Sequence, residues 1–189
     1  MRAVIKNSAE HGFEYVTDYP DPKPADGQVV IEVAAASLCG TDREVYEWTP
    51  SAQAFNLNLP VATGHEGAGT VVEVGPGVTR LQVGDRVALE SHLICGQCFP
   101  CRTGDAHICE RTRIIGMHID GVFADYMAAP EDICVKLPDH ASLEVGAPCH
   151  GVAGPLDRVN GDTSRLEQGA PCWSVVAGRS VSSSPTSRS

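Results

Sequence analysis

Four of the eight cysteines lie close together in the middle of the chain. They form the pattern C-x2-C-x2-C-x7-C, made by Cys95, Cys98, Cys101 and Cys109. Two-residue gaps let consecutive thiolates wrap one ion, Gly96 permits a tight turn between them, and the fourth sulfur closes a tetrahedron. This spacing predicts a structural zinc site.

Three other interpretations of the four cysteines are weaker. The iron–sulfur pattern of bacterial ferredoxins continues with x3-C-P, whereas here the last gap is seven residues and Glu110 follows Cys109. Disulfides between cysteines three positions apart are strained, and the chain begins without the apolar core of a secretion signal, so we expect a reducing, cytoplasmic location. Unliganded thiols are the alternative left open.

A second group of ligand-type residues is divided between two segments. Cys39 stands in Cys-Gly-Thr-Asp after a long apolar run, and His65 and Glu66 stand in Gly-His-Glu-Gly-Ala-Gly. Taken alone, a single Cys or His of this kind is more often a packed core residue than a ligand. Neither segment is a metal site on its own evidence.

The segments between these residues read as many short strands. Alternating or apolar runs occur at residues 2–6, 13–17, 28–38, 69–74, 84–89, 122–129 and 133–137, with turn residues between them. Helical signals are scarce and occur at about residues 41–47 and from residue 142 onward. The pattern predicts a mainly β protein, a barrel or a sandwich, in which short helices carry some of the polar residues.

The composition fits a soluble globular protein, with 42% hydrophobic and 20% charged residues among 189. No run approaches the roughly 18 apolar residues that a membrane span needs, so we expect no membrane segment. The formal charge of −10 argues against a nucleic-acid surface and makes a zinc-ribbon nucleic-acid binder, suggested by the four cysteines alone, the weakest functional class.

The order of the motifs resembles the zinc-dependent medium-chain alcohol dehydrogenase family. An apolar strand ending in Cys-Gly-Thr-Asp, then Gly-His-Glu-Gly-x-Gly, then the four-cysteine segment is typical of that family, and Tyr-x-Trp soon after the first motif is most similar to its threonine and polyol dehydrogenase members. The resemblance covers residues 1–150. It implies a GroES-like, partly open β-barrel with short helices and a zinc lobe, forming the catalytic domain.

The resemblance also implies roles for individual residues. Cys39 and His65 would bind a catalytic zinc, Glu66 would be a direct or exchangeable ligand, and Thr41 would pass on the proton of the alcohol. Asp42 would cap a helix or orient a ligand. The implied activity is the oxidation of a small alcohol, polyol or amino alcohol with NAD(P) as acceptor, and the implied cofactors are two zinc ions per chain and NAD(P).

The sequence departs from the family pattern in two places. Glu44 stands where threonine dehydrogenases commonly have a histidine at the end of the proton relay. Near the end of the barrel, many relatives have an acidic residue where this sequence has Cys149 and His150. His150 is a candidate further zinc ligand.

The nucleotide-binding domain of the family is not recognisable in the sequence. No G-x-G-x-x-G segment of a Rossmann domain occurs, and residues 151–189 form a Ser-, Gly- and Arg-rich tail that we expect to be disordered. From this we expect a truncated catalytic domain that binds zinc but is inactive alone. The alternative is a non-catalytic zinc-bound remnant or interaction module. As partners we expect an alcohol-type substrate, no nucleic acid and no membrane, and either self-association or pairing with a full-length relative.

Overall fold

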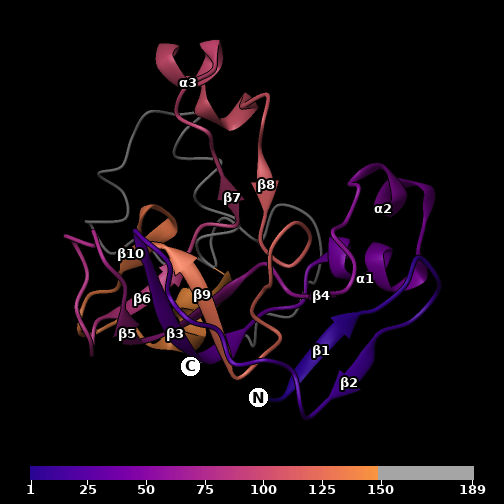
Figure 1. Ribbon diagram of the computed structural model, residues 1–189, viewed down its shortest axis with the longest axis horizontal. Coiled ribbons are helices and arrows are strands. Elements are labelled where there is room, and N and C mark those ends of the chain that lie inside the picture. The colour runs from indigo at the N-terminus through magenta and orange to yellow at the C-terminus, as the bar shows by residue number, and fades with distance from the viewer. Residues whose placement is uncertain (149–189) are drawn as a thin grey trace, which may run out of the picture.

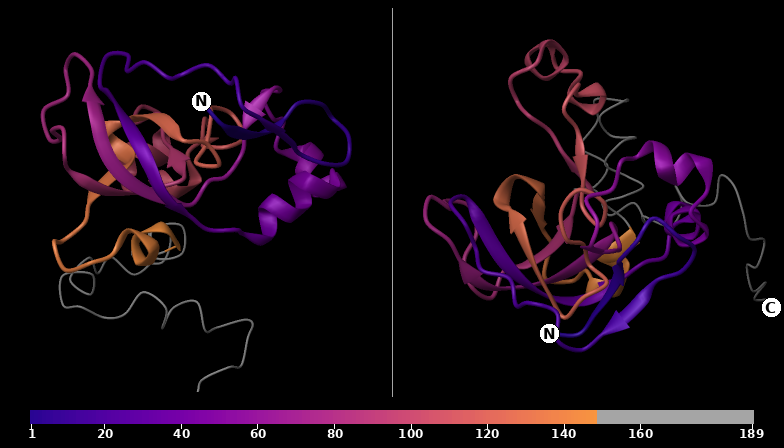
Figure 2. Two further views of the ribbon diagram at one scale, coloured as in Figure 1. Left: turned by 90° about the horizontal axis from the view of Figure 1, so that it is seen from below. Right: turned by 45° about the vertical axis from the view of Figure 1, so that its right-hand side comes forward.

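A curled antiparallel sheet forms the body of the molecule in the computed structural model, which describes residues 1–148 (Figure 1). Its strand order is β10-β6-β5-β3-β9. The strands are β3 (Gln28–Ala36), β5 (Gly67–Val74), β6 (Arg86–Leu89), β9 (Tyr126–Pro130) and β10 (Cys134–Lys136). The long strands β3 and β5 bend together along one side of the molecule, giving the sheet a half-barrel shape (Figure 2).

Two smaller sheets and several short helices complete the described part. The smaller sheets contain β1 (Ala3–Lys6), β2 (Glu14–Val16) and β4 (Val61–Ala62) in one, and β7 (His92–Leu93) and β8 (Arg113–Ile114) in the other. The α-helices are α1 (Gly40–Glu47), α2 (Pro50–Ala54) and α3 (Phe99–Thr103), and the 3₁₀ turns are η1 (Ala106–Ile108) and η2 (Glu131–Ile133). Residues 143–148 are also helical. None of the helices in residues 1–148 has the length and apolar character needed to cross a membrane.

The core lies on the inner face of the large sheet. Val29 and Ile31 of β3 are paired with Ala129 and Met127 of β9, and all four side chains are buried. Directly opposed residues of antiparallel strands point to the same face, so these pairs build one apolar layer. Val71, Val87 and Leu89 extend it across β5 and β6. This layer fixes the strand ends from which the candidate site is built.

The buried side chain of Lys6 supports the C-terminal end of α1. The Lys6 side chain is 1% exposed, and its Nζ donates to the carbonyl oxygens of Glu10 and Gly12 and lies 5.0 Å from the centre of the Trp48 ring. Gly12 N in turn donates to Tyr46 O at 2.7 Å. Burial lowers the pKa of Lys6. The ammonium group therefore holds the loop after β1 against the last turn of α1, where a positive charge also suits the helix dipole.

The mainly β, half-barrel fold expected from the sequence is confirmed, and one predicted strand was partly wrong. Residues 122–125 are not in a strand, and β9 begins only at Tyr126. The amides of Val122 and Phe123 donate instead to the carbonyls of Gly64 and Thr63. The strand predicted over 28–38 ends at Ala36, which frees the following residues to lead into α1.

Candidate metal centres

Cys39 stands at the junction between β3 and α1. It is the residue that precedes the first turn of α1, with extended backbone angles of φ −98° and ψ 161°. Asp42, three residues later, closes the helix start, because its Oδ2 accepts from Cys39 N at 2.8 Å. Three residues is one helical turn, so this is the reciprocal half of a capping box. The arrangement fixes the backbone from which the Cys39 sulfur projects.

His65 and Glu66 lie between β4 and β5, next to a backbone segment that is hydrogen-bonded to residues 121–123. The amides of Gly121, Val122 and Phe123 donate to the carbonyls of Ala62, Gly64 and Thr63 at 2.8, 3.0 and 2.8 Å. At Gly64 and Gly121 the two backbone segments lie so close together that neither position has room for a side chain.

Two glycines make this approach feasible. A Cβ added to Gly121 would lie 2.0 Å from Gly64 O, and one added to Gly116, whose φ is +73°, would lie 2.4 Å from it. Real Cβ atoms essentially never come within 3.0 Å of another heavy atom in this way. The loop of residues 116–123 thus holds the His65-Glu66 backbone at a fixed position.

The two segments bring Cys39, His65 and Glu66 into one cluster. One ligand-type atom from each lies within 4.8 Å of those of the others. His65 and Glu66 are both 8% exposed, and Cys39 is half-buried. Thr41 Oγ1 lies 3.8 Å from Cys39 Sγ, so the hydroxyl is beside the cluster. A thiol, an imidazole and a carboxylate are ligand types that zinc accepts.

The imidazole of His65 is oriented by Asp42. Its Nδ1 lies 3.3 Å from Asp42 Oδ1, and both side chains are nearly buried. Burial lowers the pKa of His65, but the hydrogen bonds and charges of Asp42 and Cys39 outweigh it and raise the pKa to about 9. The sequence suggested Asp42 as a cap or an orienting group, and it makes both contacts. With Nδ1 turned to Asp42, Nε2 is left for another partner.

The carboxylate of Glu66 has a partner that sequence reasoning missed. Ser37, in the last position before Leu38 and Cys39, donates its hydroxyl to Glu66 Oε2, and its backbone N donates to Glu66 O at 3.0 Å. Serine next to an apolar strand carries no distinctive signal in the sequence. The pairing of β3 with β5 is what places the two residues together.

The four cysteines of the second cluster come together in a projecting lobe built from β7, α3, η1 and β8 (Figures 1 and 2). Their sulfurs lie within 4.8 Å of one another, and Cys98 Sγ is 3.4 Å from Cys101 Sγ. Gly96 and Gly104, with φ of +68° and +95°, make the turns that wrap the chain round them. In the described residues this is the second of two clusters of ligand-type side chains.

Backbone amides point at two of these sulfurs. The amides of Gln97 and Cys98 each lie 3.4 Å from Cys95 Sγ, and they lower the pKa of Cys95 to about 6. The amides of Cys95 and Arg111 approach Cys109 Sγ at 3.3 and 3.4 Å, and the pKa of Cys109 is likewise lowered. Hydrogen bonds to a thiolate favour the ionised form that binds metal.

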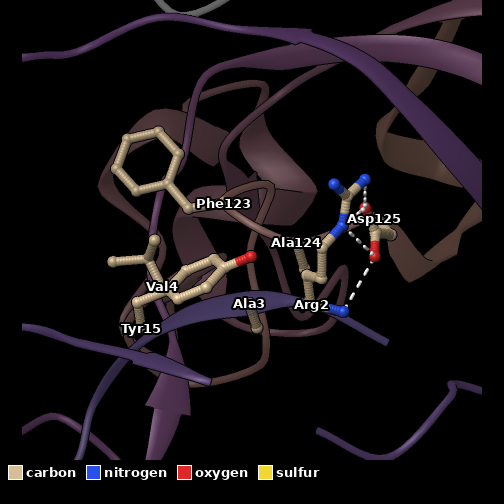
Figure 3. A pocket seen from close by; sticks show the side chains of 7 residues that line it. All are labelled: Arg2, Ala3, Val4, Tyr15, Phe123, Ala124 and Asp125. Carbon is tan, nitrogen blue, oxygen red and sulfur yellow. Dashed lines mark hydrogen bonds and ion pairs between the residues drawn. The ribbon is translucent and has the colours of Figure 1, made fainter. Parts of the chain in front are cut away.

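His150 and Cys149, considered above as a further ligand pair, and the predicted tail of residues 151–189 lie outside the described residues. Within them, a hollow is lined by residues of β1, β2 and the loop before β9 (Figure 3). Its charged groups, Arg2 and Asp125, are already paired with each other at 2.7 Å. The hollow contains none of the candidate residues.

Comparison with known proteins shows which family the chain resembles. Residues 25–139 match the family described as the alcohol dehydrogenase GroES-like domain. Over 144 residues the chain is 44% identical to L-threonine 3-dehydrogenase of Pyrococcus furiosus, an alignment that takes in 76% of this chain and 41% of that protein. The chain therefore spans about two fifths of the length of that relative.

Solved structures show the same partial coverage. A crystal structure described as an NAD-dependent alcohol dehydrogenase matches with a TM-score of 0.69 at 34% identity, over 78% of this chain and 42% of that one. A cobalt- and zinc-bound thermostable alcohol dehydrogenase from Pyrobaculum aerophilum matches with a TM-score of 0.67 at 33% identity, over 81% and 45%.

Proposed function

Because the chain belongs to the family of alcohol dehydrogenase GroES-like domains, we propose that Cys39, His65 and Glu66 hold a catalytic zinc ion at which an alcohol is oxidised. The observation that carries the proposal is the convergence of these three side chains from segments 26 residues apart. The cobalt- and zinc-bound relative from Pyrobaculum aerophilum supports the choice of metal.

The donor set suits zinc in type and in charge. Alcohol dehydrogenases are the standard example of a catalytic zinc site with two cysteines and one histidine, and here Glu66 stands where a second anionic ligand is needed. A thiolate, a carboxylate and a neutral imidazole balance the two positive charges of the ion. Since His65 Nδ1 faces Asp42, its Nε2 is the nitrogen that we assign to the metal.

Each of the surrounding residues has a definable task in this proposal. A zinc ion, when bound, supplies a Lewis acid that makes an alcohol hydroxyl easier to deprotonate. Thr41 would relay that proton, its hydroxyl taking it up while releasing its own proton outward, which the hydroxyl position beside Cys39 supports. Asp42 keeps His65 in the tautomer that leaves Nε2 free of a proton. Glu66 would hold the ion as an exchangeable ligand.

The electrons of the alcohol go to NAD(P) as a hydride in this proposal. The description of one structural neighbour as NAD-dependent supports a nicotinamide acceptor. For the substrate, the name of the Pyrococcus furiosus relative favours an amino alcohol of the L-threonine type over a simple alcohol or a polyol. The four cysteines of the lobe hold a second, structural zinc ion, for which the mutual proximity of their sulfurs is the support.

Metal content and substrate binding test the proposal without any acceptor. Purified chain should contain two zinc ions, and His65→Ala should retain only one, that of the lobe. In cobalt-substituted protein, L-threonine should shift the visible bands in a saturable way, and His65→Ala should abolish the shift. One metal ion per chain in the parent protein, or bands that no alcohol perturbs, would refute a catalytic zinc at this cluster.

A further inference from the structure

Ser37 and Glu66 face each other across the ends of two paired strands. The register of β3 and β5 pairs Ala36 with Gly67. Ser37, which follows Ala36, therefore lies opposite Glu66, which precedes Gly67. Ser37 N donates to Glu66 O at 3.0 Å, continuing the ladder by one bond. The side chains add a second link, from Ser37 Oγ to Glu66 Oε2.

The hydroxyl is well placed to control a buried carboxylate. Glu66 is 8% exposed, and among residues 1–148 the Ser37 hydroxyl is the hydrogen-bond donor that its carboxylate has. A carboxylate oxygen engaged by an O–H group is held in one orientation, and the other oxygen remains for a metal ion.

The backbone delivers the hydroxyl and the sulfur to the same side. Ser37 Oγ donates to Glu66 Oε2, and the sulfur of Cys39 lies within 4.8 Å of a carboxylate oxygen of Glu66, so both side chains face Glu66. Leu38 between them points outward with 81% exposure. One short segment thus carries a proposed metal ligand and the partner of another.

We propose that Ser37 is a positioning residue for the metal centre: its hydroxyl holds Glu66 so that one carboxylate oxygen, and not both, reaches the metal. A ligand attached through one oxygen exchanges more readily than one attached through two, which suits a position that a substrate must take. The inference rests on the proposed function, since it presumes a metal at Cys39, His65 and Glu66.

A substitution can separate this role from ordinary strand pairing. Ser37→Ala removes the hydroxyl but keeps the backbone N that donates to Glu66 O. Ser37→Thr restores a hydroxyl on the same backbone. Ser51→Ala, at an exposed serine in α2, is the matched control.

The experiment measures cobalt binding to the full chain by competition with a chelator, together with the visible spectrum of the bound ion. The centre with one sulfur is distinguished from the four-sulfur lobe by its spectrum. We expect Ser37→Ala to weaken cobalt binding at the Cys39 centre by about 10- to 100-fold, the range typical of residues that orient a ligand. Ser37→Thr should recover most of this loss, and the lobe should bind cobalt normally in every variant.

A double-mutant cycle with Glu66→Gln decides whether the effect passes through Glu66. In that background, Ser37→Ala should have no further effect on cobalt binding. An undiminished effect in the Glu66→Gln background, or the same affinity in Ser37→Ala as in the parent and Ser51→Ala, would overturn the role of Ser37 and leave the metal centre intact. A parent chain that binds cobalt in the lobe alone would instead overturn the proposed function.

Discussion

Asp42 touches His65 and the backbone of Cys39 at the same time: Oδ1 lies 3.3 Å from His65 Nδ1, and Oδ2 accepts from Cys39 N at 2.8 Å. One carboxylate therefore couples the start of α1 to the imidazole on a separate segment. Both contacts are to groups that donate a proton, and the carboxylate offers one oxygen to each.

The isosteric change Asp42→Asn should weaken zinc binding at Cys39, His65 and Glu66 by about 10- to 100-fold. An amide has one accepting oxygen, so either the Cys39 amide loses its partner or His65 Nδ1 meets an N–H group and its proton moves to Nε2. Chelator competition measures the affinity. Asp26→Asn, at an exposed site, is the control, and an unchanged affinity in Asp42→Asn would show that Asp42 does not orient the imidazole.

Gly116→Ala should destabilise the zinc-loaded chain more than Gly77→Ala, by about 1–3 kcal/mol, the usual cost of forcing extra atoms into a packed site. The two glycines have nearly equal φ of +73° and +76°, so the backbone strain of alanine is matched. They differ in space, because the new Cβ would lie 2.4 Å from Gly64 O in one case and 3.8 Å from Gly27 N in the other. Urea denaturation compares them, and equal losses would show that the approach to Gly64 is easily relaxed.

Cys101→Ser should remove one zinc ion per chain and leave the ion at the Cys39 centre in place. Binding of a structural zinc contributes on the order of 10 kcal/mol in small zinc domains, so the lobe of the variant should become sensitive to proteolysis. Elemental analysis and limited digestion measure the two effects. Cys134→Ala is the control, since this buried cysteine belongs to neither cluster in the described residues and its loss should not change the zinc content.

Lys6→Met should lower the free energy of unfolding by about 1–3 kcal/mol at neutral pH, because the carbonyls of Glu10 and Gly12 lose a buried donor. The loss should grow at alkaline pH. The folded-state pKa of Lys6 lies below its ordinary value of 10.5, so just below pH 10.5 the unfolded chain binds more protons than the folded one, and the stability due to Lys6 rises with pH there. Chemical denaturation at several pH values measures the difference, and Lys23→Met, at an exposed lysine, should show neither effect.

The sequence predicted the mainly β fold well because its strands are apolar runs with turns between them. It also predicted a helix at about residues 41–47, which the structure has as α1 (Gly40–Glu47). The short strands β4, β7 and β8 were not predicted, because each is two residues long and has no periodic pattern in the sequence. The strand expected from Val122 failed because the amides there are bonded to the segment before His65 and not to a neighbouring strand.

The four cysteines of the lobe were found from residue type and spacing, whereas Cys39, His65 and Glu66 were implied by the family resemblance; the structure brings each set together. Their metal binding stays a prediction. Asp42 was expected as a cap or an orienting group, whereas the contact of Ser37 with Glu66 was not predictable, because it joins positions far apart in the chain. Such a pairing depends on the register of β3 and β5, which no local pattern in the sequence reveals.

Leu38 points outward between Ser37 and Cys39, and this arrangement limits how the segment of residues 37–39 can change in evolution. Adding or deleting a residue between Ser37 and Cys39 would displace one of them relative to the other, so either the sulfur or the hydroxyl would no longer face Glu66. Length changes here should therefore be disruptive, whereas the exposed residue itself is free to vary. Homologues should therefore differ in identity at position 38 far more than in the spacing around it.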